Sequence, residues 1–181
     1  TAWSALGMPT NGSIRALAVL PSGDLIAGGQ FTTVGGVPAN SIARWNGTSW
    51  SALGTGMNGT VITLALLPNG DLIAGGAFTT AGGVTVNNIA RWNGTSWSAL
   101  GTGTSSIVLA LAELPNGDLI AGGHFNAAGG VAANRIARWN GTTWSPLGTG
   151  MDGDVSTLAV LSNGDLIAGG AFITAGGRIS A

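Results

Sequence analysis

The sequence predicts an all-β fold, a β-propeller made of four-stranded blades that follow one another along the chain. Two observations predict it: a repeat of 47 residues, and four short strand-like segments within each repeat. The repeat is marked by two sets of tryptophans and one set of aspartates. These are Trp3, Trp50, Trp97 and Trp144; Trp45, Trp92 and Trp139; and Asp24, Asp71, Asp118 and Asp165. A unit of about 40 to 50 residues with four strands is typical of a propeller blade.

Each unit contains four apolar or β-branched segments separated by Gly, Pro and Asn residues. In the second unit the predicted strands are residues 61–67, 71–78, 89–92 and 96–100. Asn93-Gly94 lies between the third and the fourth strand, and Asn-Gly is a strong signal for a tight hairpin. Residues 79–83 are a Gly-rich connection. No segment has helical spacing over three turns, so the pattern favours blades over a solenoid of strands and helices.

The composition agrees with blades that are buried on both faces. Only 7% of the residues are charged, against about 25% in typical soluble domains, and 33 of the 181 residues are glycine. A blade packed between two neighbours contains near-continuous apolar runs. Small residues such as Ala74, Gly75 and Gly76 are expected to let adjacent blades approach closely. We therefore expect the apolar surface to lie between blades.

The whole chain, residues 1–181, is expected to form one propeller domain of about four blades. The repeats are residues 1–47, 48–94, 95–141 and 142–181. Residues 1–6 match the fourth strand of a unit, and we expect them to complete the last blade, in which Arg178 to Ala181 would begin the third strand. Three arrangements fit the repeats: four blades that close by themselves, a second chain that completes a larger ring as a homodimer, and a piece of a longer array.

The charge and the residue types exclude several classes of partner. The basic residues are six arginines and the formal net charge is −1, whereas nucleic-acid surfaces depend on clustered Lys and Arg. No apolar run reaches about 18 residues, the length that a membrane-spanning helix requires. We therefore expect neither nucleic-acid binding nor membrane insertion. The absence of cysteine excludes disulfides and Cys-based metal or nucleophile sites.

We expect no cofactor and no metal site. Residues 54–59 and 148–153 both match GxGxxG, but a dinucleotide-binding fingerprint must open a helix, and here a strand follows. The recurring aspartate comes directly after a turn glycine and lacks the clustered oxygen ligands of calcium-binding repeats. Its expected role is structural, because an Asp at this position accepts hydrogen bonds from backbone N–H groups of the turn.

No catalytic residue is predicted, and the chain is interpreted as a protein without enzymatic activity. His124 is the only histidine. Without a second His, a Cys or clustered acids, neither a catalytic triad nor a metal hydrolase can be assembled. An enzyme with its site at the mouth of the propeller, built from His124 and the four recurring aspartates, is the third functional hypothesis.

The candidates for a ligand site are side chains that recur in and just before the third strand. They are Arg44, Arg91 and Arg138; Trp45, Trp92 and Trp139; and Asn40, Asn87 and Asn134. An exposed Trp beside Arg and Asn could stack on the apolar face of a sugar. The main interpretation of these tryptophans is packing between blades, with the indole N–H bonded to a carbonyl. The asparagines either cap backbone groups or line a pocket in each blade. The tryptophan set that begins with Trp3 is predicted to be core.

Three motifs recur through the whole chain: I-A-x-W-(N/D)-G, W-x-x-L-G and G-G-x-F-(T/N). A unit with these motifs resembles the repeats of the fungal cortical cell-polarity marker family, and also kelch-like propeller repeats of large secreted or surface bacterial proteins. Unlike the kelch pattern proper, the chain has no Tyr. The resemblance implies an extracellular or surface-displayed propeller that is used for binding or scaffolding, with no catalytic residues to carry over.

Together these observations predict a non-enzymatic, extracellular β-propeller that acts as a binding or structural scaffold module for a protein or glycan ligand. The alternative is a multivalent carbohydrate-binding lectin with one shallow site per blade. That site would be built from the Arg-Trp strand, the Asn-containing loop and the Gly-rich connection. Such a lectin would gain avidity from its repeated sites.

Overall fold

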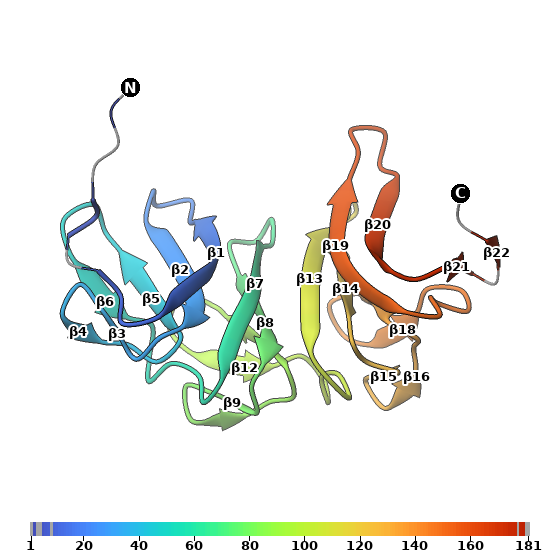
Figure 1. Ribbon diagram of the computed structural model, residues 1–181, viewed down its shortest axis with the longest axis horizontal. Helices are drawn as coiled ribbons and strands as arrows, with labels where there is room; N and C mark the ends of the chain where they lie inside the picture. Colours follow the sequence, from blue (N-terminus) through green and yellow to red (C-terminus); the bar gives the residue numbers. More distant parts are fainter. Residues whose placement is uncertain (1, 3–4, 8, 177, 180–181) are drawn as a thin grey trace.

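The computed structural model describes residues 2, 5–7, 9–176 and 178–179 of the chain. All regular structure in these residues is β-strand, arranged as successive antiparallel sheets that follow an arc (Figure 1). No helix that could span a membrane is present in this part of the chain. The all-β prediction is confirmed.

Each large sheet is one blade, and its strands pair in chain order. Blade 1 contains β1 (Ser13–Val19), β2 (Leu25–Gln30), β5 (Ile42–Trp45) and β6 (Trp50–Ala52). Blade 2 contains β7 (Thr60–Leu66), β8 (Leu72–Ala77), β11 (Ile89–Trp92) and β12 (Trp97–Ala99). Blade 3 contains β13 (Val108–Glu113), β14 (Leu119–Gly123), β17 (Ile136–Trp139) and β18 (Trp144–Pro146). Blade 4 contains β19 (Asp154–Val160) and β20 (Leu166–Ala171). The first strands of neighbouring blades contact one another.

A small hairpin follows the second strand of every blade, where the sequence predicts only a Gly-rich connection. These hairpins are β3 (Thr33–Val34) with β4 (Val37–Pro38), β9 (Thr80–Ala81) with β10 (Val84–Thr85), β15 (Ala127–Ala128) with β16 (Val131–Ala132), and β21 (Thr174–Ala175) with β22 (Arg178–Ile179). Gly82 and Gly83 form the β9–β10 turn with φ angles of 58° and 82°, which glycine adopts readily. In Figure 1 the β9 and β15–β16 hairpins lie at the bottom, whereas the β19–β20 turn lies at the top.

The prediction about the C-terminal end is wrong. The segment from Arg178 does not begin a third strand, because Arg178–Ile179 is the second strand of a small hairpin, equivalent to β10 and β16. Ser180 and Ala181 lie outside the described residues. At the other end, the Leu6 carbonyl accepts a hydrogen bond of 2.9 Å from Trp50 Nε1 in blade 1. The described part of blade 4 pairs β19 with β20. That residues 1–6 complete this blade stays a prediction, because Thr1, Trp3 and Ser4 lie outside the described residues.

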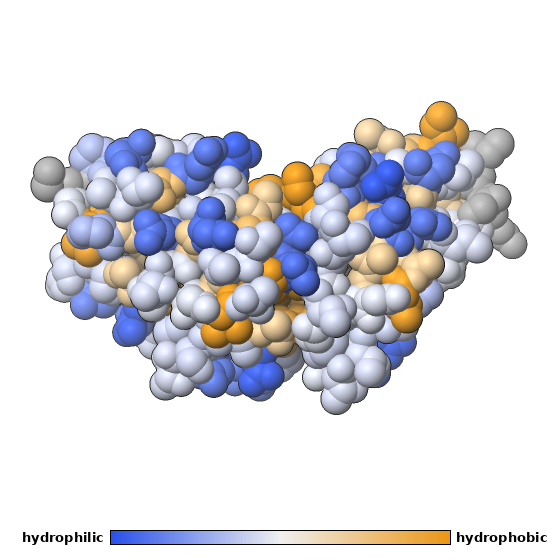
Figure 2. Space-filling view, turned by 90° about the horizontal axis from the view of Figure 1, so that it is seen from below, coloured by the Kyte–Doolittle hydropathy of each residue, from blue (hydrophilic) through white to orange (hydrophobic). Residues whose placement is uncertain are grey.

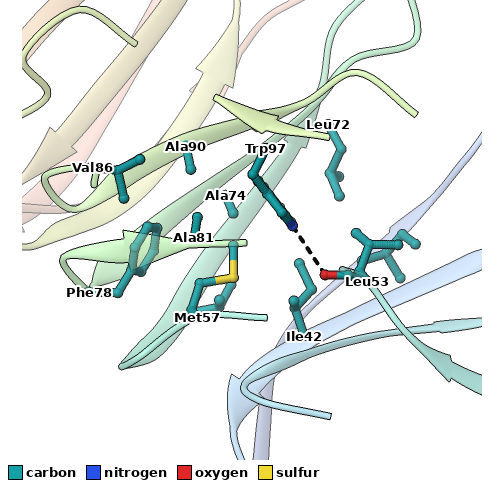
Figure 3. Close-up of a cluster of buried hydrophobic side chains, with 12 residues drawn as sticks. Ile42, Leu53, Met57, Leu72, Ala74, Phe78, Ala81, Val86, Ala90 and Trp97 are labelled. Carbon is teal, nitrogen blue, oxygen red and sulfur yellow. Dashed lines mark hydrogen bonds between the residues drawn. The ribbon is translucent and has the colours of Figure 1, made fainter. Parts of the chain in front are cut away.

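The hydrophobic core lies between blades, as predicted. At the junction of blades 1 and 2, Ile42 and Leu53 from the first blade meet Met57, Phe78 and Trp97 from the second (Figure 3). Equivalent clusters occupy the next two junctions. The central Ile and Val positions are fully buried at all three junctions, whereas Leu147, Met151 and Phe172 beside blade 4 are only partly buried.

Two positions of β8, Gly75 and Gly76, accept only a glycine-sized residue. A Cβ added to Gly75 would lie 2.7 Å from a Val108 methyl group of blade 3, so this glycine does allow close approach between blades. A glycine is required at position 76 for a different reason. An added Cβ there would collide with the Thr60 carbonyl oxygen of the same blade, beside the β-bulge between Val61 and Thr63.

The W-x-x-L-G motif links each blade to the one before it. Trp97 is 4% exposed, and its Nε1 donates to the Leu53 carbonyl oxygen at 3.1 Å (Figure 3). Trp144 donates to Leu100 in the same way at 2.9 Å. Gly54, with φ of 63°, packs against the Trp97 ring. The core prediction holds for Trp50, Trp97 and Trp144, while Trp3 lies outside the described residues.

Candidate binding site

The recurring arginines and aspartates, which the sequence suggests as separate candidates, are partners of one another. Each arginine on a third strand forms an ion pair with the aspartate that precedes the second strand of its own blade. The pairs are Arg44–Asp24 at 2.5 Å, Arg91–Asp71 at 2.8 Å and Arg138–Asp118 at 2.6 Å. The aspartate side chains are about nine-tenths buried, whereas the arginine side chains are 45% exposed. The pairs hold the turn between the first two strands against the third strand.

The aspartates are structural, but their partners differ from those expected. The Asp71 carboxylate accepts from Asn69 Nδ2 at 2.7 Å, and the Asp71 backbone N–H donates to Asn69 Oδ1 at 3.0 Å. Side-chain donors, Asn69 and Arg91, therefore satisfy this carboxylate in place of the turn N–H groups that the sequence suggested.

The tryptophans of the third strands are half-buried against the core tryptophans of the fourth strands. The ring centroids of Trp45 and Trp50 are 5.5 Å apart and the planes are tilted by 50°. The pairs Trp92–Trp97 and Trp139–Trp144 have the same geometry at 5.3 and 5.4 Å. This is favourable aromatic packing within the blade.

The recurring asparagines fasten the linker that leads to the next blade. Nδ2 of Asn40, Asn87 and Asn134 donates to the carbonyl oxygen of Thr55, Thr102 and Thr149 at 3.1, 2.8 and 3.1 Å. Of the two roles that the sequence left open, the capping of backbone groups is observed at every copy. Asn40 and Asn87 also line grooves between blades.

The nine candidate residues do not gather into one site. The Arg44–Asp24 pair lies at the start of β2, while the groove that contains Asn40 lies at its end, beside Gln30. Six residues of extended strand span roughly 20 Å. One end of the blade therefore carries Arg44 and Trp45, and the opposite end carries Asn40. Their role in ligand binding stays a prediction.

Grooves between successive blades are the feature that sequence reasoning missed. The groove between blades 1 and 2 has a volume of about 560 Å³, and the one between blades 2 and 3 about 440 Å³. The first is lined by Asn11, Gln30, Thr32, Asn40, Asn58 and Thr60, among others. The second is lined by Thr79, Asn87, Asn88, Thr102, Thr104 and Ser105, among others. Figure 2 shows the molecule from below, the side on which the β9 and β15–β16 hairpins lie.

Some of the polar side chains that line the first groove are held by hydrogen bonds within the protein, and others have no such bond. Asn58 Oδ1 accepts from the backbone N–H groups of Thr79 and Thr80, both at 2.9 Å, so it shapes the loop. In contrast, the side chains of Gln30 and Thr60 make no hydrogen bond to another described residue. These two side chains are available to a ligand.

The corresponding positions between blades 3 and 4 carry ionisable side chains. His124, Arg135 and Asp154 occupy the places that Gln30, Ser41 and Thr60 hold between blades 1 and 2. His124 Nδ1 lies 2.8 Å from both Asp154 carboxylate oxygens, and Arg135 Nε lies 3.6 Å from Oδ1. The carboxylate comes from the repeat that follows His124, so the sequence of a single repeat does not predict this contact. No group of three or more His, Cys, Asp or Glu that could hold a metal occurs in the described part of the chain.

Asp152 lies beside this cluster and carries the one resolved pKa shift of the described residues. The backbone N–H groups of Thr174 and Ile173 donate to its carboxylate and lower its pKa below the ordinary 3.8.

Comparison with known proteins identifies the family. The model of the Rax2 C-terminal beta propeller domain matches residues 2–107. The chain belongs to this family. A second model, described as a β-propeller domain of unknown function, matches residues 114–141. The predicted propeller fold and the predicted resemblance to the cell-polarity marker family are both confirmed. Membership of the Rax2 propeller family supports a binding or scaffold module.

Solved propellers share the fold of this Rax2-family chain. The WD40 β-propeller domain of Doa1 is 19% identical, with a TM-score of 0.59 over 87% of this chain and 48% of that chain. A catalytically inactive virginiamycin B lyase from Staphylococcus aureus is 15% identical, with a TM-score of 0.57 over 88% and 49%. The computationally designed Ika8 protein is 17% identical, with a TM-score of 0.57 over 90% and 44%. The chain thus spans about half the length of these propellers. No curated protein matches it significantly.

Proposed function

We propose that this propeller is a non-enzymatic, extracellular or cell-surface binding module whose ligands occupy the grooves between successive blades. The observation that carries the proposal is that grooves with an uncharged polar lining occur at two junctions and share the repeat positions of Thr32, Asn40 and Asn58. Their volumes fall within the range of about 300–1,000 Å³ that is common for ligand sites.

The lining favours neutral ligands rich in hydrogen-bonding groups. All the residues that line the two grooves are uncharged, and most carry amide or hydroxyl groups. Such groups bind a neutral polar ligand without the large cost of desolvating a charge. An exposed peptide segment of a protein partner fits this chemistry.

A second candidate is the multivalent lectin, which the same lining also favours because sugars present many neutral hydroxyl groups. The site would then lie in the grooves, with Gln30 and Thr60 as contacts, in place of the Arg-Trp strand. Repeated grooves would give avidity for branched or polymeric glycans.

The decisive experiment screens the chain against arrays of neutral glycans and of extended peptides, and then tests two groove substitutions. Gln30→Ala installs the residue that Ala77 supplies in blade 2, and Thr60→Asp installs the residue that Asp154 supplies in blade 4. Because the repeat already contains both residues, the fold is expected to accept them. Together they should weaken binding at least about tenfold.

Ser22→Asn is the matched control, since it installs the residue of blades 2 and 3 at the opposite end of β2. This variant should bind like the parent chain. Binding that survives the groove substitutions but is lost on changing Trp45 would move the site back to the Arg-Trp strand. A hydrolytic or lyase activity that disappears in His124→Ala would contradict the non-enzymatic part of the proposal.

The location outside the cell is supported by the resemblance of the repeats to those of surface and secreted propellers. Labelling of intact and permeabilised source cells with an antibody against the chain tests it. A signal that requires permeabilisation would contradict this part of the proposal.

A further inference from the structure

Three repeat positions at the rim of each junction change from blade to blade. They lie at the end of the second strand, directly before the third strand, and at the start of the first strand of the next blade. We call each set a rim surface: Gln30, Ser41 and Thr60 are the first, Ala77, Asn88 and Ile107 the second, and His124, Arg135 and Asp154 the third. The neighbouring segments A-G-G and I-A-R-W-N-G are identical in these three repeats, so the change is confined to particular positions.

The three positions of a rim surface meet in space. In the third surface, His124 Nδ1 lies 2.8 Å from the Asp154 carboxylate oxygens and Arg135 Nε lies 3.6 Å from Oδ1. All three residues of the first surface line the groove between blades 1 and 2. Each surface is therefore built jointly by two adjacent blades.

The middle position of each surface has a backbone conformation that most residues avoid. Ser41, Asn88 and Arg135 are the non-glycine residues with positive φ in the described part of the chain, at 62°, 62° and 65°. Of the three residue types, only Asn adopts this conformation readily. Hydrogen bonds to strand 2 hold it: Gly29 N–H donates to the Ser41 carbonyl oxygen and Ser41 N–H to that of Phe31, both at 2.9 Å. The backbone is thus constant, and only the side chain that it directs to the rim changes.

Strand pairing joins the three rim surfaces into one row. Thr60 of the first surface pairs with Ala77 of the second in the register of β7 and β8. The His124 N–H of the third surface donates to the Ile107 carbonyl oxygen of the second at 2.9 Å. Because stacked sheets lie about 10 Å apart, the row spans about 20 Å, which is the length of about six residues of extended chain.

The first two surfaces offer different chemistry to a ligand. The side chains of Gln30 and Thr60 make no hydrogen bond to another described residue, so the first surface presents free polar groups. The second surface has Ala77 and the half-buried Ile107 at the equivalent positions. It therefore offers an apolar contact.

The third surface contains a guanidinium with free hydrogen-bond donors. The distance of 3.6 Å from Arg135 Nε to Asp154 is too long for a hydrogen bond, and Asp154 contacts His124 Nδ1 more closely. Arg135 makes no side-chain hydrogen bond within the described part of the chain. A guanidinium recognises a carboxylate through two parallel N–H···O bonds. The third surface is therefore suited to the side chain of Asp or Glu.

We propose that the row binds one extended peptide, and that its three rim surfaces select an amide or hydroxyl side chain, an apolar side chain and a carboxylate, in that order along the row. The inference rests on the proposed function, because it takes the grooves between blades as the binding sites. A peptide fits the row better than a glycan of identical units, since a repeated unit would be matched by identical surfaces. The differences between the repeats thus determine the sequence of the ligand.

A library of capped eight-residue peptides, randomised at every position, tests the selection against the purified chain. The enriched peptides should share an Asp or Glu that lies about three residues from an apolar side chain, because about 10 Å of extended strand holds three residues. Enrichment without an acidic residue overturns the inference. Neutral glycan polymers are screened in parallel. Binding of glycans but not of peptides overturns the inference and leaves the grooves as binding sites, whereas binding of neither overturns the proposed function as well.

An exchange of rim surfaces between repeats tests the assignment. The triple variant His124→Ala, Arg135→Asn and Asp154→Ile gives the third surface the residues of the second, which the fold already contains at these repeat positions. It should bind an enriched acidic peptide at least about tenfold more weakly than the parent chain does. The same peptide with Asn or Gln in place of its acid should bind both chains alike.

Glu113→Val is the matched control, since it removes a charge at the opposite end of β13 and installs the residue of blades 1 and 4. It should bind the acidic peptide like the parent chain, and circular dichroism checks that both variants remain folded. A folded triple variant that keeps the preference for the acidic peptide overturns the inference, although the grooves would still bind peptides. A loss of the same size in the control also overturns the assignment to the third surface.

Discussion

The junction of blades 2 and 3 and that of blades 3 and 4 bury the same isoleucine and valine positions but have different polar rims. In the interior, Ile73 and Val108 at one junction correspond to Ile120 and Val155 at the other, and all four are fully buried. At the rim, residues without an ionisable group at the first junction give way to ionisable residues at the second. The sets are Ala77, Asn88 and Ile107 against His124, Arg135 and Asp154.

The difference separates the positions that make the fold from those that are open to function. The interior positions are constrained because each side chain packs against the neighbouring blade, so a change of side-chain volume there lowers the stability of the fold. The rim positions are partly exposed to solvent, and the His124 side chain is 55% exposed, so their chemistry can change without disturbing the packing between blades. A rigid scaffold with variable loops at one edge is a common basis for binding sites.

The largest expected effect tests whether the two interiors are equivalent. Ile73→Ala and Ile120→Ala should each lower the unfolding free energy by about 2–5 kcal/mol, because both remove buried methyl groups and leave a cavity. Urea unfolding followed by tryptophan fluorescence measures both. A cost below about 1 kcal/mol for one variant, with a large cost for the other, would break the equivalence.

A smaller effect is expected at the charged rim. His124→Ala should cost about 0–1 kcal/mol in unfolding free energy, because a solvent-exposed contact between a histidine and a carboxylate contributes little. The same urea experiment at low and high salt measures it, and the cost should shrink as salt rises. Asp154→Asn removes the other partner, and the double variant should be no worse than the more harmful single variant. A cost as large as that of Ile120→Ala would show that this rim is part of the core.

The smallest effect concerns Asp152, which stands where blade 3 has Ser105 and blade 2 has Asn58. Its pKa is lowered by the backbone N–H groups of Thr174 and Ile173, so its contribution to stability is complete above the unfolded-state pKa near 3.8. That contribution is lost as pH falls through the lowered pKa. Thermal unfolding between pH 6 and pH 2.5 should therefore show a slightly steeper acid decline in the parent chain than in Asp152→Asn. Identical curves would contradict this sign.

Much of the fold could be predicted because the repeat marks equivalent positions and each strand leaves a local pattern. The burial of Trp97 and the close approach at Gly75 follow from that pattern. The small hairpins escaped prediction because strands of two residues, such as Thr80–Ala81, are too short to show alternation.

The candidate site was less predictable because it lies between repeats. A period shows which positions are equivalent, but not which different positions meet. His124 and Asp154 are 30 residues apart and come from adjacent blades. The Arg44–Asp24 pair lies within one blade, yet it joins a turn to a strand that does not follow it directly.

The bond from each indole to the preceding linker has a consequence for how the gene can change length. Trp97 is joined to Leu53 and Trp144 to Leu100, a constant offset of 44 residues. Deletion or duplication of 47 consecutive codons, from any starting point, therefore leaves every remaining indole with a leucine carbonyl at the same offset. Recombination between copies yields chains in which only the number of modules has changed, so orthologues are expected to differ by whole modules.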